Sequence, residues 1–77
     1  MDKPEEFRYP AKLVAMGRRG SFRLTYEAPN GLHDGVFKVI ERVGKKTLHG
    51  VAEVGSASMS ASVERTGKQD MLILYDD

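Results

Sequence analysis

Two stretches of the chain, residues 39–48 and 62–71, carry almost the same turn motif, and this repeat limits the fold more than any other feature. In each, an apolar residue is followed by Glu-Arg, one β-branched residue and then Gly-Lys. Gly readily takes the positive φ that a two-residue type II′ turn requires, and β-branched residues suit the flanking strands. The repeat therefore predicts two tight β-hairpins.

Further turn signals divide the rest of the chain. Residues 17–20 read Gly-Arg-Arg-Gly between two apolar runs, residues 29–35 read as a longer loop, and Gly55-Ser56 marks another turn. Reversals spaced by about ten residues are typical of all-β sandwiches and barrels. We expect strands at about 7–16, 22–28, 36–43, 47–54, 57–63 and 71–75.

Apolar residues alternate with polar ones between these turns, which is the period-two pattern of strands with one buried face. The alternation is clear over residues 22–28. Over residues 57–63, the apolar residues alternate with a row of serines. The last strand is apolar on both faces and is expected to be the most buried. Gly50 and Ala52 are small, which predicts a close approach by a backbone or a ring.

Residues 36–43 fit two patterns. As a helix, they would place Val36, Val39, Ile40 and Val43 on one side. Half of the eight residues are β-branched, however, which favours a strand. We therefore expect an all-β fold, a six-stranded antiparallel meander that forms a small barrel or a two-layer sandwich, with an α+β fold carrying one helix at about 34–43 as the alternative. Residues 1–6 are expected to be a flexible tail, and 7–77 a single β domain.

One local resemblance is present. Residues 9–13, 20–26 and 29–31, which read Tyr-Pro-Ala-Lys-Leu, Gly-Ser-Phe-Arg-Leu-Thr-Tyr and Pro-Asn-Gly, resemble the opening hairpin of HicB-type antitoxins. The resemblance covers residues 9–35 alone. The acidic, Ala-rich helix of that family has no clear counterpart, and no function is transferred.

Composition narrows the functional classes. The chain has no cysteine, and its longest apolar run, residues 71–75, is far shorter than the roughly 20 residues of a membrane span. His33 and His49 are the two histidines, and no metal-ligand spacing, nucleophile elbow or phosphate-binding loop is present. We expect a soluble cytoplasmic protein that is not an enzyme and uses no metal or cofactor.

The arrangement of charge matters more than its sum, because the formal net charge is only +1. In a meander, alternate turns lie at the same end. The first, third and fifth turns are the basic ones, and a basic rim is therefore predicted from Arg18, Arg19, Arg42, Lys45, Lys46, Arg65 and Lys68. Glu41, Glu64 and Asp70 would weaken its field, and Arg65 is expected to lie opposite Asp70.

This layout suggests a small binding module that acts stoichiometrically on a protein or nucleoprotein with an anionic face, for instance as an accessory or inhibitory protein of nucleoprotein machinery. Direct nucleic-acid binding by the same rim is one alternative. The other is a homodimer or larger homo-oligomer built through edge strands, with the serine row as a candidate edge. Phe22, Tyr26 and Phe37 are expected in the core, whereas Tyr9 and Tyr75 are the candidates for exposed contacts.

Overall fold

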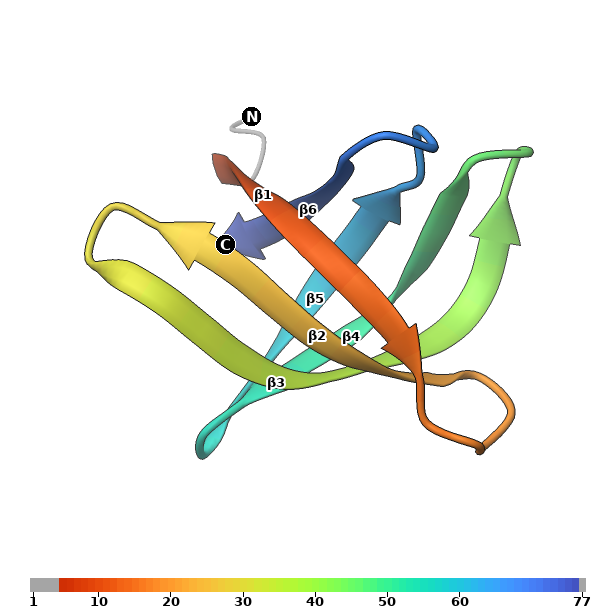
Figure 1. Cartoon of the computed structure of the whole chain (residues 1–77), viewed down its shortest axis with the longest axis horizontal. Coiled ribbons are helices and arrows are strands. Elements are labelled where there is room, and N and C mark those ends of the chain that lie inside the picture. Colours follow the sequence, from red (N-terminus) through yellow and green to blue (C-terminus); the bar gives the residue numbers. More distant parts are fainter. Residues whose placement is uncertain (1–4, 77) are drawn as a thin grey trace.

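The computed structural model describes residues 5–76, in which six antiparallel strands close into a barrel (Figure 1). The strands are β1 (Glu5–Ala15), β2 (Ser21–Ala28), β3 (Gly31–Val43), β4 (Thr47–Val54), β5 (Ala57–Glu64) and β6 (Asp70–Asp76). Each strand pairs with the next along the chain, and β6 pairs with β1. Of the two architectures predicted for the meander, the barrel is therefore the one that forms.

The alternative with a helix at 34–43 is wrong, because these residues lie within β3. Phe37 is fully buried and stands between Phe22 of β2 and Ala52 of β4, so that a strand gives it partners on both sides. The predicted loop over residues 29–35 is also shorter than expected. β3 already begins at Gly31, because His33 and Asp34 pair across the sheet with β2.

β1 begins at Glu5, two residues before the strand was expected, and Glu5 and Glu6 pair with the end of β6. The predicted tail otherwise falls on residues 1–4, outside the described residues. β1 changes its neighbour part-way: residues 5–11 pair with β6, whereas residues 11–15 pair with β2. Pro10 thus has a strand on one side only, as expected for a residue without a backbone N–H.

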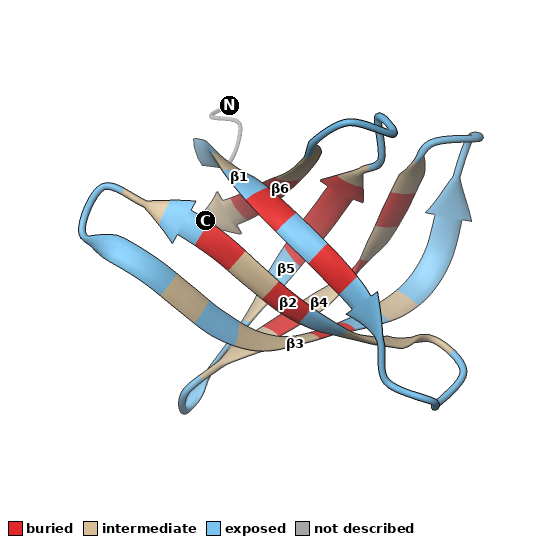
Figure 2. Ribbon diagram, viewed as in Figure 1, coloured by how far each residue is buried: buried red, intermediate tan, exposed pale blue. Residues whose placement is uncertain are grey.

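The core fills the inside of the barrel, and burial alternates along the strands (Figure 2). Its largest fully buried side chains are Leu24, Phe37, Val63 and Leu72, which come from four different strands. The prediction for β6 is confirmed, since its residues 72–74 are all buried. Burying each such side chain contributes about 1.5–3 kcal/mol, so this small interior is the main source of stability.

Two glycines allow strands to approach closely. A Cβ at Gly50 would overlap the backbone carbonyl of Lys38, and one at Gly35 would overlap that of Glu53. The predicted close approach at Gly50 is therefore confirmed. Because both sites lie between β3 and β4, they let these strands bend sharply around the core.

The two hairpin motifs do form turns, and Gly44 and Gly67 adopt the expected positive φ of 78° and 88°. The two-residue length is wrong in both cases. Val43 pairs with Thr47, which leaves residues 44–46 in the β3–β4 turn, and residues 65–69 connect β5 to β6. The positive φ of Gly identifies where a chain reverses, but strand register sets how many residues the turn contains.

Candidate functional site at one end of the barrel

The β1–β2, β3–β4 and β5–β6 turns lie at the same end of the barrel, toward the right-hand side of Figure 1. We call this the three-turn end, comprising residues 16–20, 44–46 and 65–69 with the strand ends that flank them. The β2–β3 and β4–β5 turns lie toward the opposite side. Of the seven predicted rim residues, six lie in these turns and Arg42 lies in the last part of β3; all seven are exposed.

Four of the seven predicted residues line one small recess, which we call the end recess. Arg42, Lys45, Lys46 and Arg65 surround it, with Phe22 and Leu48 as its apolar lining. Its volume is about 60 Å³. Because a water molecule takes up about 30 Å³ in the liquid, the size of the recess suits one small anionic group.

A β-bulge explains why Arg42 faces this recess. The register between β3 and β4 shifts between Val39 and Glu41, so that Ile40 is the extra residue. Beyond the bulge, Arg42 stands opposite Leu48, whose side chain is buried inside the barrel. Without a bulge, strict alternation would have put Glu41 on the inner face with Val39 and Arg42 on the outer one.

The β3–β4 and β5–β6 turns are tied together beside the recess. The Arg65 backbone N–H donates to the Lys46 carbonyl oxygen at 2.7 Å. The Arg65 guanidinium lies 3.7 Å from a carboxylate oxygen of Asp70, whose side chain is 15% exposed. This confirms the predicted pairing of Arg65 with Asp70 and means that Arg65 brings less uncompensated charge than its neighbours.

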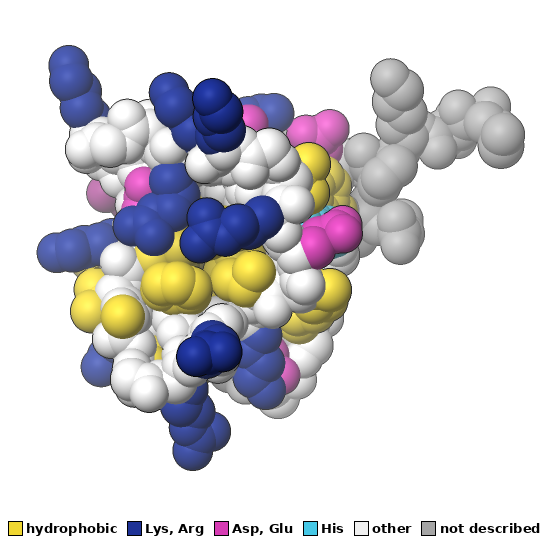
Figure 3. Space-filling model, turned by 90° about the vertical axis from the view of Figure 1, so that its right-hand side faces the viewer, with side chains coloured by type: hydrophobic (Ala, Val, Ile, Leu, Met, Phe, Trp, Pro, Cys, Tyr) yellow, Lys and Arg dark blue, Asp and Glu magenta, His cyan; other side chains and the backbone are white. Residues whose placement is uncertain are grey.

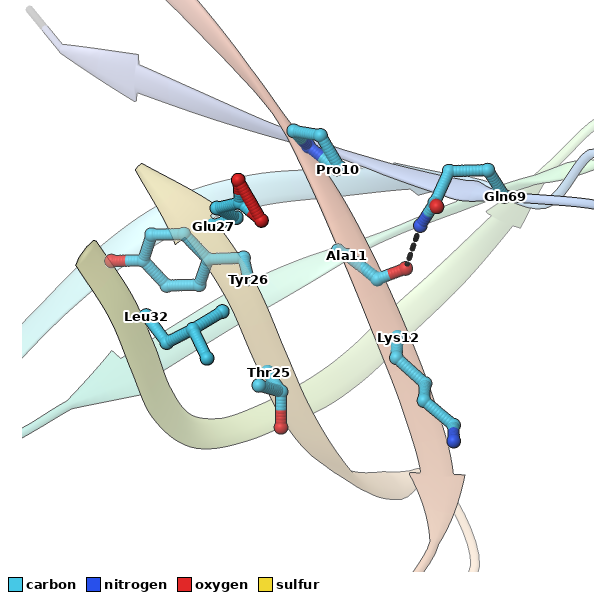
Figure 4. A pocket seen from close by; sticks show the side chains of 8 residues that line it. All are labelled: Pro10, Ala11, Lys12, Thr25, Tyr26, Glu27, Leu32 and Gln69. Atoms are coloured by element: carbon cyan, nitrogen blue, oxygen red, sulfur yellow. Dashed lines mark hydrogen bonds between the residues drawn. The ribbon is translucent and has the colours of Figure 1, made fainter. Parts of the chain in front are cut away.

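A second, larger depression lies beside the recess, between β1 and the β5–β6 turn. This β1 groove has a volume of about 660 Å³ and includes Lys12, Leu13, Arg65 and Lys68 in its lining. Its wall is held by Gln69, whose side-chain amide donates to the Ala11 carbonyl oxygen at 2.9 Å (Figure 4). The pocket drawn in Figure 4, of about 170 Å³, lies on the other side of β1, toward β2.

The sequence did not predict Lys12 as part of this surface, because Lys12 lies in a strand and the charges were sought in turns. Pro10 does not mark the strand edge at Lys12, because Pro10 lacks its neighbour on the β2 side, whereas residues 12–15 lack theirs on the β6 side. Arg18 and Arg19, in contrast, lie in the exposed β1–β2 turn and line neither the end recess nor the β1 groove.

Cations of the barrel wall and cations of the three-turn end differ in their ion pairing. Arg8 lies 3.3 Å from Glu64, Arg23 lies 2.8 Å from Asp34, and Lys38 lies 3.3 Å from Glu53, measured between nitrogen and carboxylate oxygen. No ion pair to another residue of 5–76 involves the remaining rim side chains: Arg18, Arg19, Arg42, Lys45, Lys46 and Lys68.

Exposed apolar side chains accompany these cations. Val14, Met16, Ile40 and Val43 are each about half exposed or more, and they lie in or beside the ends of β1 and β3 that reach this end. Figure 3, which looks at this side, shows hydrophobic side chains among Lys and Arg, with Asp and Glu mostly toward the margin. An exposed apolar patch with a polar rim is typical of a protein-interaction surface.

The aromatic residues mostly serve the fold. Tyr9 and His33 stack on the two sides of Tyr26, with ring centroids 5.5 and 5.1 Å away. Burial raises the pKa of Tyr26, with a further contribution from Tyr9. The expectation that Tyr9 is an exposed contact is therefore wrong, because stacking on Tyr26 half-buries its ring.

Tyr75, the other expected contact, is also half-buried. Its hydroxyl donates to Ser62 Oγ at 3.0 Å, and His49 Nδ1 lies 3.0 Å from the same oxygen. Ser62 is only 4% exposed, so this part of the serine row is not free surface. Tyr26, Phe37 and, in part, Phe22 lie in the core as predicted.

Within residues 5–76, no group of three or more His, Asp or Glu side chains is placed to hold a metal ion. The same residues contain no helix long and apolar enough to cross a membrane.

Comparison with known proteins adds no further constraint: no protein-family model, curated protein or solved structure matches the chain.

Proposed function

We propose that this protein is a non-enzymatic binding module whose three-turn end docks on a protein, or on the protein part of a nucleoprotein, that presents an anionic face. It acts stoichiometrically, as an accessory or inhibitory subunit would. The observation on which the proposal rests is the uneven distribution of ion pairs among the cations. Arg8, Arg23 and Lys38 on the barrel wall have carboxylate partners, whereas the cations around the end recess, apart from Arg65, have none among the described residues.

The apolar side chains favour a protein over bare nucleic acid as the partner. Val14, Met16 and Val43 are exposed next to the cations, and apolar contact contributes little to a phosphate backbone. Single-stranded nucleic acid would need stacking platforms, but the aromatic side chains of the barrel are buried or half-buried apart from Phe7, which lies at the start of β1, far along the chain from the three turns. A protein face with carboxylates around apolar residues complements this end better.

Direct nucleic-acid binding remains the second candidate, because the end recess has the size of one phosphate group and several cations around it. A homo-oligomer through edge strands has less support. β5, which carries the serine row, pairs with β4 along its whole length and with β6 over residues 61–64. In a closed barrel, such pairing leaves only short unpaired segments.

The test is capture of partners from a lysate, identification by mass spectrometry, and titration of the purified pair. The variant Arg42→Glu with Lys45→Glu reverses two unpaired cations of the end recess and should weaken the affinity by about tenfold or more. The matched control, Arg8→Glu with Arg23→Glu, makes the same change in net charge on the barrel wall. It breaks only exposed ion pairs, worth about 0–1 kcal/mol each, and should leave the affinity nearly unchanged.

Equal loss of affinity in both variants would show that net charge alone, and not the three-turn end, controls binding. Oligonucleotide titration of the same proteins separates the candidates: tight, salt-dependent binding to any duplex or single strand, lost in the recess variant, would replace the protein partner with nucleic acid.

A further inference from the structure

β1 loses its neighbour on the β6 side before it ends. Residues 5–11 pair with β6, but β6 begins at Asp70, which stands opposite Ala11. Residues 12–15 continue beyond it and pair with β2 alone. This four-residue segment is therefore a free strand edge of the barrel, and its first two residues, Lys12 and Leu13, line the β1 groove.

The direction of the backbone groups shows what this edge offers. Along a strand, successive residues direct their N–H and C=O groups to opposite neighbours. The Ala11 carbonyl points toward the β6 side, because it accepts a hydrogen bond from the Gln69 side chain. Leu13 and Ala15 follow the same alternation, so their N–H and C=O groups point to the β6 side of β1, where no residue of β6 stands opposite them.

The groove carries charge of one sign next to this edge. Lys12 and Lys68 line it, and neither makes an ion pair with another residue of 5–76. Its volume of about 660 Å³ lies within the range of about 300–1,000 Å³ that is typical of ligand-binding clefts. Asp70 also lines the groove, but Arg65 neutralises it.

The other strand segments that lack a neighbour are less suited to pairing. Residues 5–10 of β1, which lack β2 as a neighbour, contain Pro10 and begin with Glu5 and Glu6. Residues 40–43 of β3 include the bulge residue Ile40, which disrupts the regular spacing of backbone groups. Residues 31–35 contain two glycines, which weaken a strand. Residues 57–60 of β5 carry no charge that would select a partner. The segment 12–15 contains no Gly, Pro or bulge.

We propose that an extended acidic segment of a partner protein adds to residues 12–15 as an extra β-strand within the β1 groove. Backbone hydrogen bonds to Leu13 and Ala15 would supply affinity, and Lys12 with Lys68 would select carboxylates in the added strand. The idea rests on the proposed function and names its partner class: a β-forming stretch in which Glu or Asp alternates with apolar residues.

The experiment uses the full chain and a short synthetic peptide of alternating Glu and Val, blocked at both ends. Amide hydrogen exchange is followed by NMR. Saturating peptide should slow exchange at Leu13 and Ala15 by about tenfold or more, while Lys12 and Val14, which already face β2, change little. N-methylation of alternate peptide residues, which removes their N–H donors, should abolish the effect.

Charge selection is tested with two variants. Lys12→Glu with Lys68→Glu should weaken peptide binding by about tenfold, whereas Arg8→Glu with Arg23→Glu, which makes the same change in net charge on the barrel wall, should change it by less than about twofold. A peptide of alternating Lys and Val should not bind. Binding of both peptides with equal affinity would contradict selection by charge and overturn the idea.

The remaining outcomes separate this idea from the proposed function. If the Glu-Val peptide shifts Phe22 and Leu48 while exchange at Leu13 and Ala15 stays the same, the added strand is excluded but an anion-binding three-turn end survives. If Leu13 and Ala15 become protected with rising protein concentration and no peptide, the edge pairs with a second copy of the chain, and the acidic partner segment is excluded.

Discussion

At the residue scale, glycines, which lack a Cβ atom, and paired charges determine the local structure. Gly50 is required because a Cβ there would overlap the Lys38 carbonyl, although its backbone needs no positive φ. Gly44 is the opposite case: its φ is +78°, and a Cβ would meet nothing within 4 Å. One glycine serves packing between strands and the other serves a turn.

These two roles predict different costs of the same substitution. Gly50→Ala should lower the free energy of unfolding by about 3 kcal/mol, because β3 and β4 must separate to admit the methyl group. Gly44→Ala should cost about 1 kcal/mol, the penalty of a left-handed conformation for an L-residue. Urea denaturation of both variants provides the measurement, and equal costs would contradict the close approach of the two strands.

Asp34 gives a prediction about pH. Its hydrogen bond from Arg23 holds the pKa of this carboxyl below its ordinary value of 3.8. A lowered pKa in the folded state stabilises the fold above the unfolded pKa, and this contribution disappears as the pH falls through the folded value. Wild type should therefore be more stable than Asp34→Asn by a constant margin above about pH 5, a margin that shrinks below pH 3.8.

Thermal unfolding from pH 2 to pH 8 is the measurement. The variant Arg23→Gln is the control, since removing the donor should remove the same margin over the same range. A margin that grows as the pH falls would have the wrong sign for this ion pair.

At the element scale, β3 connects the core to the binding surface. Its first part pairs with β2, its second part pairs with β4, and the bulge at Ile40 lies between Val39 and the end of the strand. The side chain of Ile40 is 69% exposed. The bulge therefore does not serve the core, and its structural effect is to place Arg42 on the inner face above Leu48.

Deletion of Ile40 tests this interpretation of β3. The pairs of Glu41 with His49 and of Arg42 with Leu48 should persist in a regular ladder, so the variant should fold with a stability within about 1 kcal/mol of wild type and keep its affinity for the partner. Deletion of Lys38 is the matched control. It would move Phe37 out of register with Ala52, turn an inner side chain outward and unfold the domain.

Circular dichroism and heteronuclear NMR spectra distinguish these outcomes. If both deletions unfolded the protein, Ile40 would be a structural residue and not an inserted one.

At the scale of the whole molecule, the order of the strands and the distribution of charge are linked. Because each strand is antiparallel to the one before it, the five turns are divided between two ends, three at one and two at the other. A chain with a formal net charge of only +1 can in this way present, at one end, cations that form no ion pair within residues 5–76, while Arg8, Arg23 and Lys38 on the wall form exposed ion pairs. Such a layout affects association more than folding.

Ionic strength should therefore act differently on binding and on stability. Raising NaCl from about 50 mM to about 500 mM should slow association with an anionic partner by about tenfold or more, since the Debye length falls from roughly 14 Å to 4 Å. The urea midpoint of unfolding should change little, because exposed ion pairs contribute at most about 1 kcal/mol each. Stopped-flow association and denaturation at both salt concentrations test the two parts separately.

The order of strands, their antiparallel sense and the buried faces of the regularly alternating strands, such as 22–28, followed from the sequence, because alternation and turn residues act between near neighbours in the chain. The placement of three basic turns at one end follows from the same topology. Register depends on packing between strands, and sequence reasoning therefore missed the Ile40 bulge, the three-residue β3–β4 turn and the strand at Gly31. It is tertiary structure that directs Arg42 over the end recess, leaves Arg18 and Arg19 outside both depressions and gives Lys12 a free strand edge. Each of these depends on which residues of different strands stand opposite one another, and a one-residue shift in pairing reverses every side chain that follows it.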